Sequence, residues 1–284
     1  MSLSDTWIHD FGKFKMVLDK NDADVSTQIK EYGWYEDEKL ETKVFKNCLK
    51  LGMTVLDLGA NIGFYTMFAR SIVGTKGRVY AFEPSPLNAN LIRASVRENS
   101  FDNVTVIEAA VADRVGNAPL YLSPETYSEH SLLNLESKYD PRWKNQKIDV
   151  KVVTVDDYLK KIVGNFKVDF IKMDIEGSES RALKGMKKVL DENIHIILMT
   201  EFWPNGFKED NMNPGNFLET LHKSGFVIHH IDSFEKKVYE VTVNEMMEIV
   251  DSRSKDKLKQ NEVMRVWGWY TNLLCTRTPE NCIY

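Results

Sequence analysis

The sequence predicts an α/β protein whose doubly wound, mostly parallel sheet carries helices on both faces. From residue 54 onward, seven short apolar segments rich in β-branched and aromatic residues alternate with helix-compatible stretches. A glycine turn separates the first of these segments from the helical pattern that follows it. The chain has 284 residues, of which 43% are hydrophobic, and this is enough for a sizeable core.

The predicted strands follow one another at spacings that leave room for crossover helices. They cover residues 54–58, 78–82, 104–108, 168–173, 194–200, 226–231 and 269–275. Two further strands are expected on either side of a long polar loop, so the region near residues 117–150 is interpreted as an insertion. Because loops of this length are often functional, this one is a candidate for covering a substrate. Another helix is expected within residues 241–266.

Residues 1–50 precede the first buried strand and mix charges with scattered aromatic side chains. We interpret them as a helical N-terminal extension, followed by a single domain over residues 51–284. The aromatics, among them Trp34 and Tyr35, would either anchor the extension to the domain or cover one side of a substrate cleft.

The first chemical motif is a strand, a glycine turn, a helix and a second strand. It reads TVLDLGANIG over residues 54–63 and AFEP over residues 81–84. Gly59 and Gly63 permit a tight turn and a close approach of a ligand to the backbone. Glu83 ends the second strand, where a carboxylate can accept hydrogen bonds from both hydroxyls of a ribose. The pattern indicates a nucleoside-binding site.

The composition of this loop narrows the choice of nucleoside. It lacks the Gly-Lys-Ser/Thr that would bind a triphosphate. Asp57, Gly59 and Gly63, with Asn61 between the glycines, also differ from the three-glycine pattern that binds a dinucleotide pyrophosphate. Asp57 would repel a pyrophosphate but suits an ammonium group, which S-adenosylmethionine carries beside its sulfonium. The loop therefore favours this cofactor over NAD, and a dehydrogenase is the alternative.

A second set of polar side chains follows the fourth and fifth predicted strands. Lys172 and Asp174 lie on one face of the strand by alternation, Glu176 follows them, and Glu201 ends the next strand. Because ligands bind at the carboxyl ends of parallel strands, the three acidic residues are expected to surround one cleft. They would act as a general base, hold substrate hydroxyls or chelate a hard divalent cation. The alternative for Asp174 is a structural ion pair with Lys172.

Charge and hydropathy exclude several other classes. The net charge of −5, without a block of Lys and Arg, argues against nucleic acid as a partner. No apolar run reaches the roughly 18 to 20 residues of a membrane span, and the N-terminus lacks a signal-peptide pattern. We therefore expect a cytoplasmic protein, with its oligomeric state left open.

With both motifs in view, the chain resembles the FkbM-type family of S-adenosylmethionine-dependent methyltransferases. The matching pieces run in order over about residues 50–205: VLDLGANIGFYT at 55–66, AFEP at 81–84, AAVADRVG at 109–116, TVD at 154–156, IKMDIEGSE at 171–179, and Glu201. The first two pieces are typical of class I methyltransferases in general. The run of lysine, aspartate, glutamate and glycine at 172–177 makes the resemblance specific.

The resemblance implies the seven-stranded, Rossmann-like fold of class I methyltransferases and a set of cofactor contacts. The residues that would bind the methionine part are Asp57, Gly59, Asn61 and Gly63; those for ribose and adenosine are Glu83, Pro84 and Ser85, and those at the adenine edge are Ala110 and Val111.

The resemblance also implies O-methylation of hydroxyls on sugars, glycans or macrolides. Asp174, Glu176 or Glu201 would accept the proton of the hydroxyl, or a bound cation would lower its pKa. Lys172 is the alternative base if burial depresses its pKa. We predict a sugar or glycan acceptor, because carboxylates bind hydroxyls and rings such as Trp203 stack on sugars. A macrolide or other small secondary metabolite, or a noncatalytic adenosine-binding module, is the alternative.

Overall fold

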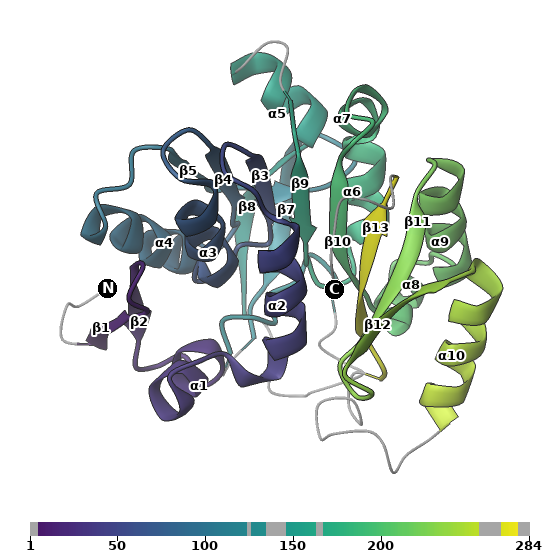
Figure 1. Cartoon of the computed structure of the whole chain (residues 1–284), viewed down its shortest axis with the longest axis horizontal. Coiled ribbons are helices and arrows are strands. Elements are labelled where there is room, and N and C mark those ends of the chain that lie inside the picture. Colours follow the sequence, from purple (N-terminus) through teal and green to yellow (C-terminus); the bar gives the residue numbers. More distant parts are fainter. Residues whose placement is uncertain (1–4, 124–125, 135–145, 163–166, 256–267, 278–284) are drawn as a thin grey trace.

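The computed structural model describes residues 5–123, 126–134, 146–162, 167–255 and 268–277. Over these residues the chain forms one large sheet with helices on both faces (Figure 1). Its strands, in spatial order, are β12 (Lys237–Val241), β11 (Val227–Asp232), β13 (Thr271–Thr276), β10 (Ile197–Phe202), β9 (Phe170–Met173), β3 (Thr54–Leu58), β4 (Arg78–Phe82) and β5 (Val104–Ile107). The seven predicted strands all form, and β12 adds an eighth at the edge.

The large sheet is mostly parallel, as predicted. Strands β5, β4, β3, β9 and β10 are parallel neighbours, while β13 runs antiparallel between β10 and β11 and β12 pairs antiparallel with β11. The chain moves outward from β3 to β4 and β5 and then returns to β9 on the other side of β3. The strand order therefore reverses between β3 and β9, and ligands bind beside such a reversal at the carboxyl ends of the strands.

Helices cover both faces because the central strands are apolar on both sides. One core includes residues of α1 (Val25–Tyr32), α2 (Lys39–Cys48), α3 (Phe64–Val73) and α4 (Pro86–Glu98); the other includes residues of α5 (Val155–Ile162), α6 (Glu179–Gly185), α7 (Lys187–Glu192), α8 (Pro204–Glu209), α9 (Pro214–Lys223) and α10 (Val243–Lys255). Alternate residues of β3 contribute to the two cores, with Val55 in the first and Leu56 and Leu58 in the second. Each such buried side chain stabilises the fold by about 1.5–3 kcal/mol.

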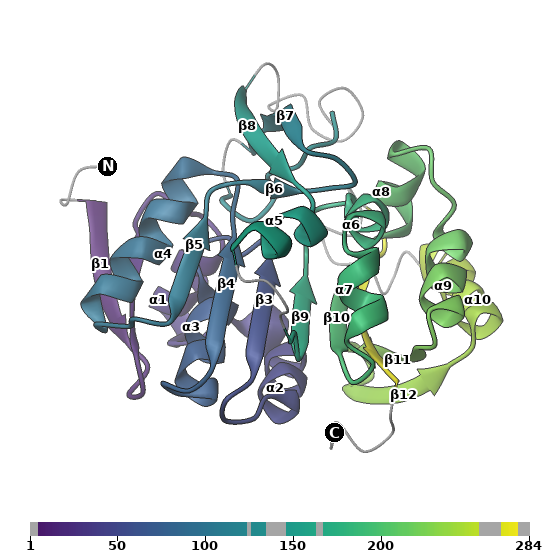
Figure 2. The ribbon, with the colours of Figure 1, turned by 90° about the horizontal axis from the view of Figure 1, so that it is seen from above.

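The N-terminal extension differs from the prediction that residues 1–50 are helical. Its described part begins with a hairpin of β1 (Thr6–Asp10) and β2 (Lys15–Asp19) and then continues into α1, the 3-10 turn η2 (Glu36–Glu38) and α2. Phe14, Met16 and Leu18 are buried at alternating positions, a period of two that favours a strand. The hairpin lies along α4 (Figure 2), where the Val17 amide donates to Ser95 Oγ at 2.9 Å. The helical prediction is therefore wrong for residues 6–19.

The insertion after β5 forms a small sheet at one end of the large one (Figure 2). It contains β6 (Ala110–Val111), β7 (Gly116–Tyr121) and β8 (Lys147–Val153), in the order β6-β8-β7. The two added strands predicted around the polar loop are therefore confirmed. Residues 126–134 of the loop are described, whereas 135–145 lie outside the described residues. The same holds for 256–267 in the region where we predicted a helix, of which α10 is the described part.

None of the described helices is both long and apolar enough to cross a bilayer. The cytoplasmic location stays a prediction.

Candidate active site

The loop between β3 and α3 packs directly against the exit of β9. Gly59 has a φ of +81°, and a Cβ atom at this position would lie 1.7 Å from the carbonyl oxygen of Asp174. Only glycine fits there, so the loop can approach the neighbouring strand closely. Asn61 also has a positive φ of 50°, and its Oδ1 accepts a hydrogen bond from Asn88 Nδ2 at 3.3 Å. These contacts hold the loop beside the point where the strand order of the sheet reverses.

Glu83 follows β4 and supports the same loop from the other side. Its Oε2 accepts from the Asn61 amide and its Oε1 from the Ser85 amide, each at 2.8 Å. The side chain is only 4% exposed, and burial raises the pKa of its carboxyl to about 8 even though the two amides favour the charged form. Each oxygen has a second lone pair that can accept from a ligand hydroxyl.

A small cavity of about 40 Å³ lies between this loop, the end of β4 and the small sheet; we call it the smaller cavity. The predicted cofactor residues that line it are Gly59, Asn61, Glu83, Pro84, Ala110 and Val111. Ala109, Ala110 and Val111 give it an apolar wall, and Glu83 gives it a buried carboxylate. An apolar wall beside a hydrogen-bond acceptor suits an adenine ring attached to a ribose. The residues present therefore fit the adenosine part of S-adenosylmethionine.

Three other predicted cofactor residues are not among those that line the smaller cavity. Asp57 is 2% exposed and its Oδ2 accepts from the Thr66 hydroxyl at 2.5 Å, while burial raises the pKa of its carboxyl to about 6. Gly63 begins α3, and a Cβ atom there would meet Ile92 of α4 at 3.1 Å. Ser85 caps the N-terminus of α4. In the structure these three residues contact α3 and α4 and so support the loop. A direct contact with the cofactor stays a prediction.

A second cavity, of about 370 Å³, adjoins the first; we call it the larger cavity. Five residues line both cavities: Gly59, Asn61, Ser128, Asp174 and Glu176. Ligands in the two cavities would therefore meet at this junction. The outer walls come from residues 23–41 of the extension, residues 126–129 of the insertion, and Tyr270 and Asn272 beside and within β13. The first two segments are joined by a hydrogen bond of 2.5 Å from Ser128 Oγ to Asp24 Oδ2.

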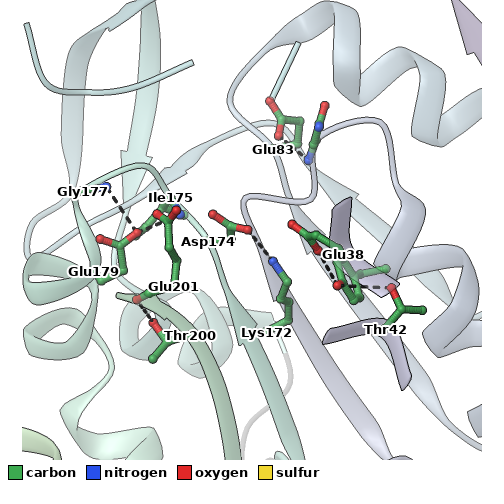
Figure 3. A network of polar contacts seen from close by, with 12 residues as sticks. Glu38, Thr42, Glu83, Lys172, Asp174, Ile175, Gly177, Glu179, Thr200 and Glu201 are labelled. Carbon is green, nitrogen blue, oxygen red and sulfur yellow. Dashed lines mark hydrogen bonds and ion pairs between the residues drawn. The ribbon is translucent and has the colours of Figure 1, made fainter. Parts of the chain in front are cut away.

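The wall of the larger cavity carries many more acidic than basic side chains. Its described lining includes eight carboxylates, those of Asp24, Asp37, Glu38, Glu41, Glu129, Asp174, Glu176 and Glu201. Lys172 is the one lysine in this lining, and its Nζ lies 2.6 Å from Asp174 Oδ2 (Figure 3). Burial favours the neutral amine, but Asp174 and Glu38 together hold the pKa of Lys172 above its ordinary value. Lys172 therefore stays protonated, and its prediction as an alternative base, which required a depressed pKa, is wrong.

Asp174, Glu176 and Glu201 form a group that we call the carboxylate cluster. The first two follow β9, and Glu201 lies in the adjacent parallel strand β10. One carboxylate oxygen from each residue lies within 4.8 Å of the other two. Burial, reinforced by the neighbouring carboxylates, raises the pKa of Glu176 and of Glu201 well above the ordinary value. The structure thus brings the three predicted acidic residues together, while their roles stay predictions.

Hydrogen bonds fix the turn that presents this cluster. Glu179 Oε1 accepts from the amides of Ile175 and Gly177 at 3.0 and 3.3 Å. The Ser131 hydroxyl donates to the carbonyl oxygen of Glu176 at 2.7 Å, where the backbone has a positive φ of 52°. Glu179 therefore acts as the cap of a strained turn, and the insertion supports that turn from the other side.

Sequence reasoning missed much of the wall of the larger cavity. Glu38 lines it and accepts from the Tyr65 hydroxyl, and burial raises the pKa of the Glu38 carboxyl to about 8. Tyr35 also lines it, whereas the Trp34 ring packs edge-on against Phe64. Tyr35 also packs edge-on against Phe64, so both rings anchor the extension to the domain, whereas the covering of a substrate cleft stays a prediction. The one local signal was the acidic run at residues 36–38, directly after these aromatics.

Comparison with known proteins gives this site a family context. The family model described as "Methyltransferase FkbM domain" matches residues 57–228. Methyltransferase sdnD of Sordaria araneosa is 22% identical over 177 residues, which are 54% of this chain and 68% of that protein. Ribosomal RNA large subunit methyltransferase E of Buchnera aphidicola subsp. Baizongia pistaciae is 34% identical over 88 residues, which are 30% of this chain and 39% of that protein.

Solved structures also superpose on this chain. The O-methyltransferase from Bacillus cereus, crystallised with S-adenosylhomocysteine, superposes with a TM-score of 0.43 at 13% identity, over 84% of this chain and 79% of that one. The family model covers more than half of the 284 residues. The protein therefore belongs to the FkbM methyltransferase family and is an S-adenosylmethionine-dependent methyltransferase.

Proposed function

We propose that the protein methylates a hydroxyl oxygen of a sugar or glycan. The position of the carboxylate cluster carries this proposal. Asp174 and Glu176 line both the smaller cavity, whose lining suits an adenosine, and the larger one, and Glu201 adjoins them there. An acceptor in the larger cavity would therefore meet the cofactor at groups that can take a proton.

The chain's own part in the reaction is to orient the hydroxyl and to accept its proton. When bound, S-adenosylmethionine supplies a methyl group that passes to the acceptor oxygen, and the electron pair of the broken C–S bond stays on sulfur. Burial raises the pKa values of Glu176 and Glu201, so each is a stronger base in its ionised form than an exposed carboxylate, and the positive charge of a bound sulfonium would favour that ionised form. Lys172 positions Asp174 and offsets part of the negative charge. A divalent cation on the cluster is a second means of lowering the pKa of the hydroxyl.

The lining of the larger cavity supports a carbohydrate acceptor. Its carboxylates can accept hydrogen bonds from several hydroxyls at once, and Tyr35, Trp203 and Tyr270 offer ring surfaces for the apolar faces of a sugar. RNA is the alternative raised by the relative named as a ribosomal RNA methyltransferase. The acidic wall opposes it, because phosphates are bound by positive groups.

The test is transfer of radiolabelled methyl from S-adenosylmethionine to three acceptors: an oligosaccharide, a macrolactone and an RNA oligonucleotide. We expect an O-methyl product on the oligosaccharide, identified by mass spectrometry. A preference for the macrolactone would favour a secondary metabolite as the substrate, and a preference for RNA would refute the proposal. Tight binding of S-adenosylhomocysteine without transfer to any acceptor would indicate a noncatalytic adenosine-binding module.

Two variants test the assignment of binding and chemistry to different residues. Asp174→Asn should lower turnover by about 100-fold or more, because it weakens the proton-accepting cluster, and should largely spare the binding of S-adenosylhomocysteine. Glu83→Ala should reduce that binding, because it removes the carboxylate at the ribose end of the smaller cavity. Glu31→Gln, at an exposed site in α1, is the control for both. Equal losses of binding in the two variants would contradict this division of roles.

A further inference from the structure

The carboxylate cluster has three acidic side chains and one basic neighbour. Among the described residues that line the larger cavity, Lys172 is the one lysine and arginine is absent. Lys172 is already bound to Asp174 at 2.6 Å (Figure 3). If all three carboxylates were ionised around a bound cation, the ammonium of Lys172 would offset one of their charges and the cation the other two.

Glu201 gives independent evidence for a further ligand. Its side chain is 8% exposed, and its buried Oε2 has no hydrogen-bond partner within the described part of the chain. A carboxylate oxygen of this residue lies within 4.8 Å of one from Asp174 and one from Glu176, so the group is directed into the cluster. A buried acceptor that lacks a donor is costly unless an ion or another ligand binds it.

Asn272 shows the same feature on the neighbouring strand. It is the register partner of Glu201 in the β10–β13 pair, so the two side chains lie on one face of the sheet. Its Oδ1 is buried and also without a hydrogen-bond partner in the described structure, and the residue lines the larger cavity. Two adjacent strands therefore present unpartnered oxygen atoms toward the same space.

The chemistry of the atoms in the cluster, and the hydrogen bonds that hold them, indicate which kind of ligand would bind. All the atoms concerned are oxygens, which hard divalent cations prefer over softer metals. The turn carrying Asp174 and Glu176 is held by hydrogen bonds from Ser131 and to Glu179, so it is organised before a ligand binds. We propose that Asp174, Glu176 and Glu201 bind a divalent cation of the Mg²⁺ or Mn²⁺ class, with the amide oxygen of Asn272 as a further ligand.

The role of this cation in catalysis rests on the proposed function, whereas its binding does not. A hydroxyl oxygen coordinated to the cation would have a lower pKa. Its O–H bond would break as the proton passes to a carboxylate oxygen of Glu176 or Glu201 that does not bind the cation. The electron pair left on the hydroxyl oxygen would form the new C–O bond, while the pair of the broken C–S bond stays on sulfur. The cation would thus neutralise the charge that develops on the acceptor.

Binding of Mn²⁺ alone tests the site without any acceptor. We would treat the full chain with EDTA, remove the chelator and titrate with MnCl₂, following free Mn²⁺ by electron paramagnetic resonance. We expect one ion per chain with a Kd below about 100 μM. Glu201→Gln and Glu176→Gln should each weaken binding by about tenfold or more, because each removes one charged ligand. Glu31→Gln should bind like the wild type.

Titration with S-adenosylhomocysteine separates failure of this inference from failure of the proposed function. Retained binding in Glu201→Gln and Glu176→Gln would show that both variants are folded. Binding of S-adenosylhomocysteine without binding of Mn²⁺ would overturn the cation site and leave the proposed function intact. Wild-type Mn²⁺ affinity in both variants would also overturn the site. Methyl transfer that is unchanged in EDTA would refute the catalytic role of the cation.

Discussion

Glu83 offers a quantitative test of the smaller cavity through the pH dependence of stability. Its carboxyl has a folded-state pKa of about 8, compared with an ordinary value of 4.5, because it is buried. As the pH rises, the Glu83 carboxyl therefore ionises at a lower pH in the unfolded chain than in the folded protein. The contribution of this group is most favourable below its unfolded pKa and is lost as the pH rises toward the folded pKa. For the protein without ligand, Glu83 alone should lower the free energy of unfolding by about 2 kcal/mol between about pH 6 and about pH 8, since each pKa unit corresponds to about 1.4 kcal/mol.

Glu83→Gln removes this ionisation. The amide can accept from the backbone with its single oxygen, so one of the amides of Asn61 and Ser85 loses its partner at a cost of about 1–3 kcal/mol at every pH. The variant should therefore be less stable than the wild type near pH 6, and the difference should shrink by about 2 kcal/mol near pH 8. Glu38, with a pKa of about 8, keeps part of the pH dependence in both proteins.

The assay is equilibrium unfolding in urea at the two pH values, without nucleoside, for the wild type, Glu83→Gln and the exposed control Glu31→Gln. Wild type and control should lose stability in parallel as the pH rises, and Glu83→Gln should lose less. If Glu83→Gln shows the full wild-type pH dependence, the carboxyl is not buried as described, and the reasoning on the ribose end of the cavity fails.

Two further predictions concern the loop and the ion pair. Gly59→Ala should abolish measurable binding of S-adenosylhomocysteine in calorimetry, because its Cβ would overlap the Asp174 carbonyl oxygen, whereas Gly116→Ala, where no atom lies within 4 Å of the added Cβ, should bind normally. Lys172→Met should lower the free energy of unfolding at neutral pH by about 3 kcal/mol or more, because it leaves Asp174 and Glu38 without their nearby cation. Urea unfolding measures this loss, and a loss below about 1 kcal/mol would contradict the prediction.

The central sheet could be predicted because each of its strands has a local signal. Parallel strands buried on both faces appear as short, mostly apolar runs, and the predicted bounds of β3 and β4 agree with the structure to the residue. Strand β12, Lys237–Val241, was missed because it is a half-exposed edge strand whose pairing with β11 depends on the tertiary fold. The hairpin at residues 6–19 did carry a period-two signal at Phe14, Met16 and Leu18, but the apolar Val17 breaks the alternation and obscures it.

The candidate site also has a part that the sequence could predict and a part that it could not. Gly59, Asn61 and Glu83 lie within one strand-turn-helix unit and the strand after it, so the sequence pattern could place them around one ligand. The same pattern could not tell that Asp57 faces Thr66, because the depth of a side chain in the sheet depends on what packs over it. The pKa of Lys172 was equally out of reach, since Glu38, which helps to raise it, is 134 positions away in the sequence.

Part of the wall of the larger cavity lies where the sequence carries no motif. The family match begins at residue 57, whereas part of the wall comes from residues 23–41 before it and from Tyr270 and Asn272 after its end at 228. The carboxylate cluster lies inside the match. If the larger cavity binds the acceptor as we propose, part of the acceptor specificity is encoded outside the family match, whereas the proposed chemistry is encoded inside it. This explains why the sequence indicated a methyl transfer more readily than the molecule that receives the methyl group, and it directs the search for specificity to the extension and to β13.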